Sequence, residues 1–406
     1  MGTPSPASTS SRASDRLPHR REWSTDRGVS RCDFAVIGAG IAGASVAYEL
    51  QARGRVVLLE RERLPGLHTT GRSAAFLVES YGNRVVGALT RGGRAFLEHP
   101  PEGFSDHPLV HPKPVVWIAR EDQRARLAQA VAAGRSSGAD LRELDAARAR
   151  ELCPALREDY LAAAAVEPNA MSIDVAGLLE AFLRGLRRRD GEIVTKAEIT
   201  RLERVGDDWE IHAGGAVHQA GVVVNAAGAW CDAVGRLAGA RPVGLRPLRR
   251  TAITFDPPPG RDVRGWPCVI DTDEDFYVKP EGGCLLASPC DETPSEPCDA
   301  TPDEYDVALV ADRVQRAMAL EIQHIRRSWA GLRSFVADRS PVIGMDPELP
   351  GFFWLAGQGG FGIMTAPAAA RAAAALIVDG ALPADLGALG LTPAQLSPAR
   401  AALTDR

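Results

Sequence analysis

One stretch of the sequence, residues 32–60, constrains the fold more than any other. It begins with a short apolar run at residues 33–37, followed directly by the pattern Gly-x-Gly-x-x-Gly over residues 38–43. Helical spacing continues over residues 45–51, and a second apolar run covers residues 55–59. This succession predicts a strand, a turn, a helix and a parallel strand, with a dinucleotide bound at the N-terminus of the helix.

Each glycine of this turn has its own physical task. Gly38 permits the tight bend, Gly40 lets a pyrophosphate approach the backbone, and Gly43 allows the helix to pack closely on the strand. Glu60 ends the second strand, where its carboxylate can accept hydrogen bonds from both ribose hydroxyls. Since a carboxylate disfavours a 2′-phosphate, the pattern favours FAD or NAD over NADP.

The composition is that of an ordinary globular protein, and 406 residues suffice for two domains. The net charge of -5 gives no reason to expect nucleic acid or an anionic membrane as a partner. No segment has the roughly 18 apolar residues of a membrane helix, so a cytoplasmic location is expected. The seven cysteines form no Cys-x-x-Cys pair, which favours free thiols and no metal site.

Both ends of the chain differ from the rest. Residues 1–31 are rich in Ser, Thr, Pro and Arg and predict a disordered tail, without the apolar segment of a secretory signal. Residues 385–406 are expected to form a C-terminal tail.

A second glycine-rich turn, residues 357–362, lies between an apolar strand and a long apolar helix. It has two interpretations: a simple packing turn, or a turn that directs the positive end of the helix toward an electron-rich cofactor atom. Between the two glycine-rich turns, short apolar runs separated by Pro and Gly predict a second, antiparallel sheet that includes residues 245–255, 276–279 and 284–287, and a further strand is expected at residues 326–336.

Five segments together resemble the D-amino-acid oxidase (DAO) superfamily of FAD-dependent amine oxidoreductases: residues 35–43, 68–75, 224–232, 329–338 and 358–365. Within it, the sequence is most similar to the bacterial D-arginine dehydrogenases. The resemblance implies an α/β plus α+β fold, in which a Rossmann-like FAD-binding domain of the glutathione-reductase type carries an antiparallel-sheet substrate domain. The FAD-binding domain would comprise residues 32–76, 168–240 and 330–384, and the substrate domain residues 77–167 and 241–329.

The resemblance also implies FAD as cofactor. We expect it to be non-covalent, because no cysteine lies between Arg333 and Gly362. The residues expected to contact FAD are Gly38, Gly40, Ile41, Ala42, Gly43, Glu60, Arg61, Thr70, Gly71, Arg72, Ser73, Ala74, Ala227, Gly228, Trp230, Gly359, Gly360, Gly362 and Ile363.

For the reaction, the resemblance implies hydride transfer from the substrate α-carbon to flavin N5, after which the imine hydrolyses to a 2-oxo acid and ammonia. Arg250 and Arg333 would grip the substrate carboxylate, since a guanidinium matches a carboxylate bidentately. Tyr81 and Tyr277 would support them, and the carbonyl of Gly360 would accept a hydrogen bond from the amine. Each of these residues also has an alternative interpretation. Without the motif, the two arginines would be solvent-exposed surface residues, and the two tyrosines would be half-buried aromatics of the core.

Four positions of the expected substrate pocket depart from the D-arginine dehydrogenase pattern, and all four lose polarity: Phe76, Val115, Phe361 and Met364. A buried guanidinium without an acidic partner is strongly penalised. The sequence therefore predicts a neutral, apolar D-amino acid as the small-molecule substrate, and poor activity on D-arginine.

Two other functions stay open at this point. An oxidase of secondary or N-methyl amino acids, similar to sarcosine or glycine oxidases, would use the same fold and the same arginines. A flavin-binding scaffold without turnover would retain the flavin but respond to no amine. The sequence does not indicate whether oxygen, a quinone or another compound accepts the electrons.

Overall fold

The computed structural model describes residues 30–404. The tail predicted for residues 1–31 lies outside this range, except for Ser30 and Arg31, which begin the first strand. Within residues 30–404 the strands form sheets of eight, nine and three strands. In the same range, no helix has both the length and the apolar character needed to cross a membrane.

The first sheet contains the predicted Rossmann-like unit. Five of its strands run parallel, in the order β20 (Phe352–Ala356), β12 (Ala216–Asn225), β1 (Ser30–Ile37), β2 (Val56–Leu59) and β9 (Glu192–Val194). The antiparallel strands are β10 (Ile199–Val205), β11 (Asp208–Ala213) and β19 (Val342–Met345). The apolar runs of the sequence thus became strands whose two faces are both covered.

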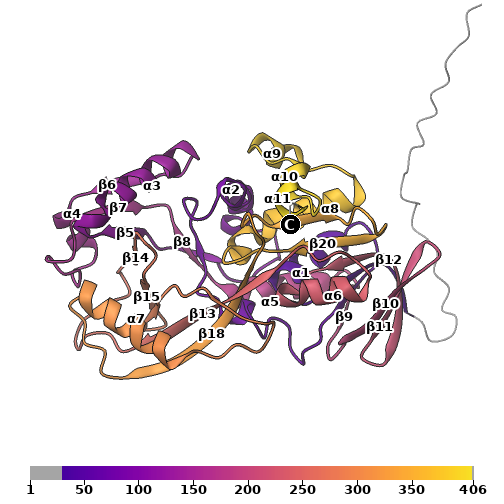
Figure 1. Cartoon of the computed structure of the whole chain (residues 1–406), viewed down its shortest axis with the longest axis horizontal. Coiled ribbons are helices and arrows are strands. Elements are labelled where there is room, and N and C mark those ends of the chain that lie inside the picture. Colours follow the sequence, from indigo (N-terminus) through magenta and orange to yellow (C-terminus); the bar gives the residue numbers. More distant parts are fainter. Residues whose placement is uncertain (1–29, 405–406) are drawn as a thin grey trace, which may run out of the picture.

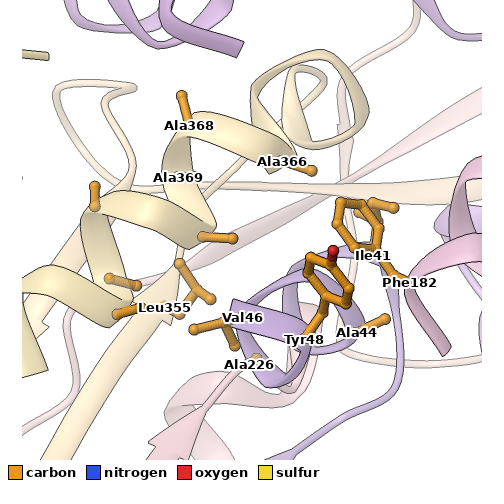
Figure 2. Close-up of a cluster of buried hydrophobic side chains, with 14 of the residues drawn as sticks. Ile41, Ala44, Val46, Tyr48, Phe182, Ala226, Leu355, Ala366, Ala368 and Ala369 are labelled. Carbon is orange, nitrogen blue, oxygen red and sulfur yellow. The ribbon is translucent and has the colours of Figure 1, made fainter. Parts of the chain in front are cut away.

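Three helices cover one face of the first sheet: α1 (Ile41–Leu50), α5 (Val175–Arg187) and α8 (Gly362–Val378). Figure 2 shows part of this core, where Ala366, Ala368 and Ala369 of α8 lie in the same cluster as Ile41 and Val46 of α1. Because α8 is apolar on nearly all sides, it is buried rather than amphipathic. The opposite face packs against α6 (Cys231–Leu237) and the β10–β11 hairpin.

The second sheet is antiparallel apart from the pairing of β5 with β14. Its strands are β5 (Val115–Ala119), β6 (Arg142–Leu144), β7 (Ala163–Glu167), β13 (Arg246–Phe255), β14 (Cys268–Asp271), β15 (Tyr277–Glu281), β16 (Cys284–Ser288), β17 (Thr293–Pro294) and β18 (Ile325–Phe335). In Figure 1, the first sheet with its helices forms one lobe of the molecule, called the first lobe, and most of the second sheet forms another, called the second lobe. β13 and β18 extend from the second lobe toward the middle of the molecule. The predicted combination of a Rossmann-like and an antiparallel sheet is confirmed, while the domain boundaries stay a prediction.

The remaining elements connect or flank the two sheets. The third sheet consists of β3 (Phe76–Leu77), β4 (Val110–Pro112) and β8 (Met171–Ile173). The other helices are α2 (Arg84–Glu98), α3 (Arg124–Ser136), α4 (Ala146–Leu152) and α7 (Glu304–Ala317), with 3₁₀ turns at Thr70–Arg72, Glu121–Gln123 and Gly228–Trp230.

The C-terminal residues, expected to form a tail, contain three short helices. These are α9 (Ala384–Ala388), α10 (Pro393–Leu396) and α11 (Ala401–Thr404). Leu386 and Leu396 are buried in the core of the first lobe. Arg400 binds both carboxylate oxygens of Asp338, at 2.7 and 2.9 Å. Single leucines spaced between turn residues anchor these short helices, and such isolated contacts leave no periodic pattern in the sequence.

Candidate active site

The first glycine-rich turn has the geometry that its glycines predict. Gly38 adopts a positive φ of 97°, and a Cβ there would lie 2.6 Å from the carbonyl oxygen of Ala226. A Cβ on Gly43 would lie only 1.7 Å from the carbonyl oxygen of Gly38. The N–H of Ile41, at the start of α1, donates to Thr70 Oγ1 at 3.0 Å. Glycine at these positions brings the helix N-terminus directly against the turn.

Glu60 directly follows β2 beside this turn and is buried. Its Oε2 accepts a hydrogen bond from the backbone N–H of Ala39 at 2.7 Å, and its Oε1 accepts one from the N–H of Glu62 at 2.8 Å. These two bonds hold the carboxylate at the carboxyl end of the parallel strands, where ligands of α/β folds bind.

One elongated cleft runs from Glu60 to the second sheet. Most residues predicted to bind the cofactor line it: Gly38, Gly40, Ile41, Ala42, Glu60, Arg61, Thr70, Arg72, Ser73, Ala74, Ala227, Gly228, Trp230, Gly359, Gly360, Gly362 and Ile363. Gly43 and Gly71 do not line it. Gly43 packs on Gly38, and the N–H of Gly71 donates to the carbonyl of Gly66 at 2.8 Å. These two glycines therefore shape the walls of the cleft.

The loop that carries residues 66–75 is tied to β18. Thr69 Oγ1 donates to the carbonyl of Leu332 at 2.8 Å, and Trp329 Nε1 donates to the carbonyl of Arg72 at 3.0 Å. The Arg72 guanidinium donates to the carbonyls of Ala300 and Ala330 and pairs with Asp299. Arg72 lines the cleft, but its charged end joins the two lobes, a role that the sequence did not indicate.

The register of β13 and β18 places two arginines on the same face. Arg250 lies opposite Gly331, and Arg333 lies opposite Leu248, so the two residues are diagonal neighbours across the strands. Both line the cleft, at the end away from Glu60. The adjacent Arg249 points to the other face, where it binds Asp306 Oδ2 at 2.9 Å.

Several hydrogen-bonding atoms at this end of the cleft have no partner. Arg250 is 7 % exposed, and its Nε and Nη1 are buried without a hydrogen-bond partner among the described residues. The same holds for Ser334 Oγ and Gln358 Nε2, and both residues line the cleft. Buried polar groups are normally satisfied, so this set indicates a site for a polar ligand. The sequence analysis assigned no role to Ser334 and Gln358, although both adjoin predicted site residues.

Arg333 is held by its neighbours on two sides. Its Nη1 donates to the hydroxyl oxygen of Tyr81 at 3.3 Å. A Cβ on Gly360 would lie 2.7 Å from the same Nη1 atom, so the guanidinium rests directly against the glycine backbone. Tyr277 lines the cleft nearby. Burial raises the pKa of Tyr81 and of Tyr277, outweighing the opposing charge of Arg333, so both hydroxyls are neutral at physiological pH.

The four residues predicted to shape the substrate pocket do not line the cleft itself. Phe76 and Val115 belong to an apolar cluster with Tyr81 and Tyr277, in which Val115 is fully buried. The ring of Phe361 meets that of Tyr81 edge-on, with 5.2 Å between centroids, whereas Met364 is buried in α8. Phe76, Val115 and Phe361 therefore pack against the tyrosines, and direct contact of all four residues with substrate stays a prediction.

Comparison with known proteins agrees with this geometry. The family model described as "FAD dependent oxidoreductase" (DAO) matches residues 33–376. The human mitochondrial sarcosine dehydrogenase is 26% identical over 371 residues, which cover 86% of this chain and 40% of the relative. The chain thus spans less than half the length of that relative. The Bos taurus FAD-dependent oxidoreductase domain-containing protein 1 is 25% identical, with 86% of this chain and 82% of the relative covered.

Solved structures show the same fold. Glycine oxidase from Geobacillus kaustophilus superimposes with a TM-score of 0.80 at 22% identity, covering 92% of this chain and 99% of that one. L-proline dehydrogenase from P. horikoshii gives a TM-score of 0.77 at 20% identity, covering 91% and 97%. These relatives do not support the specific likeness to D-arginine dehydrogenases that the sequence suggested; they support the wider family.

Proposed function

This chain belongs to the DAO family of FAD-dependent oxidoreductases, and we propose that it oxidises the amine of a small amino acid bearing a free carboxylate. The observation that carries this proposal is the pair Arg250 and Arg333 on one face of β13 and β18. Two adjacent cations need an anion between them, and the unpartnered nitrogens of Arg250 are free to bind one. An amino-acid carboxylate meets this requirement.

FAD fits the rest of the cleft. The N-terminus of α1 and the bare Cα of Gly40 suit the pyrophosphate, and the buried Glu60 carboxylate suits the ribose hydroxyls. The N-terminus of α8 points its positive end into the other part of the cleft. When bound there, FAD supplies the two-electron acceptor for amine oxidation.

The protein's own residues would orient the substrate. Arg250 and Arg333 hold the carboxylate, and the carbonyl of Gly360 accepts a hydrogen bond from the amine. Tyr81 and Tyr277, both neutral, donate or accept hydrogen bonds without adding charge. Orientation of this kind is the main catalytic contribution that such a site can make, because it converts binding into a reactive geometry. No side chain needs to act as a base if the amine arrives unprotonated.

We place secondary or N-methyl amino acids first among the substrates, because the curated relative with 26% identity is named sarcosine dehydrogenase. Neutral D-amino acids are the second class. The apolar cluster of Phe76 and Val115 behind Tyr277 favours them, since its side chains are uncharged and Lys279, whose ammonium lies 4.8 Å from the centroid of the Phe76 ring, is already paired with Glu281.

The test is anaerobic mixing of the purified yellow protein with N-methyl amino acids and with D- and L-amino acids, followed at the flavin absorbance. Bleaching by secondary amines supports the first class, and bleaching by neutral D-isomers alone supports the second. A flavin that no amine bleaches would contradict the proposed activity and leave the scaffold interpretation.

The pH dependence provides a separate prediction. We expect kcat/KM to rise with pH as the substrate amine loses its proton, and then to stay level. Because burial raises the pKa of Tyr81 and of Tyr277, both remain protonated at neutral and mildly alkaline pH, so neither causes a fall in kcat/KM there. The check is a pH profile of flavin reduction for the native enzyme and for Tyr277→Phe. A descending limb near pH 8, absent in the variant, would refute this assignment.

The linkage of the flavin can be checked directly. Among the described residues, no cysteine lines the cleft, so we expect acid denaturation to release FAD from the polypeptide. After precipitation and centrifugation, the yellow colour should be in the supernatant, and colour retained in the pellet would show a covalent bond.

A further inference from the structure

A carboxylate of the protein itself reaches the arginine pair from outside. Glu292 lies between β16 and β17, and its Oε1 accepts a hydrogen bond from Arg250 Nη2 at 3.4 Å. Arg339 binds the same carboxylate with both arms, Nη2 to Oε1 at 2.6 Å and Nη1 to Oε2 at 3.0 Å. One carboxylate oxygen is therefore shared by two guanidinium groups, and Arg339 is the stronger partner.

Arg339 is positioned by features independent of Glu292. Its guanidinium stacks on the ring of Phe335, with 3.7 Å to the ring centroid. Its backbone adopts a φ of 58°, and Cys290, two residues before Glu292, has a φ of 55°. Left-handed backbone is costly for residues other than glycine and concentrates at functional sites. Two such residues in the two short segments that form this ion pair indicate a built feature rather than a chance surface contact.

Charge explains what this arrangement does to Arg250. Burial acts to raise the pKa of Glu292, but the hydrogen bonds and charge of Arg339, with further charge from Arg250 and Arg333, hold it below its usual value. Glu292 is thus ionised at neutral pH. It binds Nη2 of Arg250, while Nε and Nη1 stay unpartnered and buried. A ligand carboxylate can bind these two nitrogens, whereas a second carboxylate that approaches Nη2 would meet Glu292.

We propose that Glu292 is a specificity-determining residue, which restricts the site to substrates with a single carboxylate. Like charge repels the second carboxylate of a dicarboxylic amine, and the groups that could hold it, Nη2 of Arg250 and the guanidinium of Arg339, are already paired with Glu292. Arg339 has the complementary positioning role: it retains Glu292 so that this carboxylate does not move inward and neutralise Arg250. This proposal rests on the proposed carboxylate-binding function of Arg250 and Arg333.

The test uses the oxidised, FAD-containing protein and ligands that cannot be oxidised as amines. Butanoate and succinate have the same chain length but differ by one carboxylate, and their dissociation constants can be read from perturbation of the flavin spectrum. For Glu292→Gln, we expect succinate to bind about tenfold more tightly than to the native protein, with butanoate changed by less than about threefold. Glu348→Gln, which removes an exposed carboxylate elsewhere, is the matched control and should change neither.

Arg339→Gln should have the opposite effect. Released from Arg339, Glu292 pairs more fully with Arg250, so butanoate binding weakens by about tenfold. The double variant Arg339→Gln/Glu292→Gln should bind butanoate as tightly as the native protein does. If Glu292 and Arg339 only stabilised the fold around the cleft, Glu292→Gln would not tighten succinate binding while Arg339→Gln weakened butanoate binding.

The outcomes separate the two levels of the proposal. If butanoate binds the native protein but Glu292→Gln alters both ligands equally or neither, Glu292 does not select against dicarboxylates. If neither carboxylate perturbs the flavin of the native protein, the arginine pair is not a carboxylate site, and the proposed function fails with it.

Discussion

Replacement of Arg333 by methionine is expected to lower kcat/KM by about 10²–10⁴-fold while leaving FAD bound. Removing one member of a buried, hydrogen-bonded charge pair costs about 3–5 kcal/mol, because the partner charge is left without compensation. Here the unpaired charge would be the substrate carboxylate. For Arg333→Lys, we expect a kcat/KM between those of the native enzyme and of Arg333→Met, because an ammonium retains the positive charge but lacks the planar, bidentate geometry of a guanidinium.

The measurements for Arg333 are steady-state kinetics with a substrate found in the anaerobic panel, the FAD content, and butanoate binding to the oxidised flavin. Arg327→Met is the matched control, because Arg327 lies on the same strand but is exposed. It should stay within about twofold of the native enzyme. Native-like kcat/KM in Arg333→Met would show that the carboxylate is held elsewhere.

Replacement of Gly43 by alanine is expected to yield a protein that purifies without flavin and unfolds more easily. The added Cβ would lie 1.7 Å from the carbonyl oxygen of Gly38, which is backbone and cannot rotate away. α1 must therefore move off β1, and the N–H groups at its start move with it. Overpacking of a rigid core costs about 1–3 kcal/mol and sometimes more, and loss of FAD removes its binding energy as well.

The checks for Gly43→Ala are the ratio of flavin to protein absorbance and the denaturant midpoint, measured with and without added FAD. Gly387→Ala is the control, because no atom outside its own chain neighbours and its helix backbone lies within 4 Å of the position of its added Cβ. The Gly387→Ala protein should retain its flavin and unfold at the same denaturant midpoint as the native protein. A yellow, equally stable Gly43→Ala protein would mean that the helix does not depend on this close contact.

The local parts of the cofactor cleft could be predicted from sequence. The turn at residues 38–43 and its flanking strands lie within about thirty residues of one another, so their spacing along the chain translates directly into geometry. The same is true of the turn at residues 357–362, which leads into α8 as expected. In both turns, glycine appears where a side chain would collide with the backbone or with a ring, as for Gly359 against Phe335.

The substrate end could be predicted only in part. The family motif selected Arg250 rather than Arg249, and strand register is the physical reason: consecutive residues of β13 point to opposite faces. By contrast, Phe76, Val115, Phe361 and Met364 do not line the cleft, and their contact with substrate stays a prediction. An apolar residue type shows that a side chain can be buried, but it does not show which surface of the cleft or core the side chain packs against.

The sequence by itself determined that this chain forms a dinucleotide-binding unit with a second glycine-rich turn, because these features depend on short-range sterics. Only the tertiary structure decided which charges meet at the far end of the cleft. Glu292 and Arg339 are 47 positions apart, and Arg333 and Tyr81 are 252 apart. Such contacts depend on the register of β13 with β18 and on the packing of separate loops, and no periodicity along the chain encodes them.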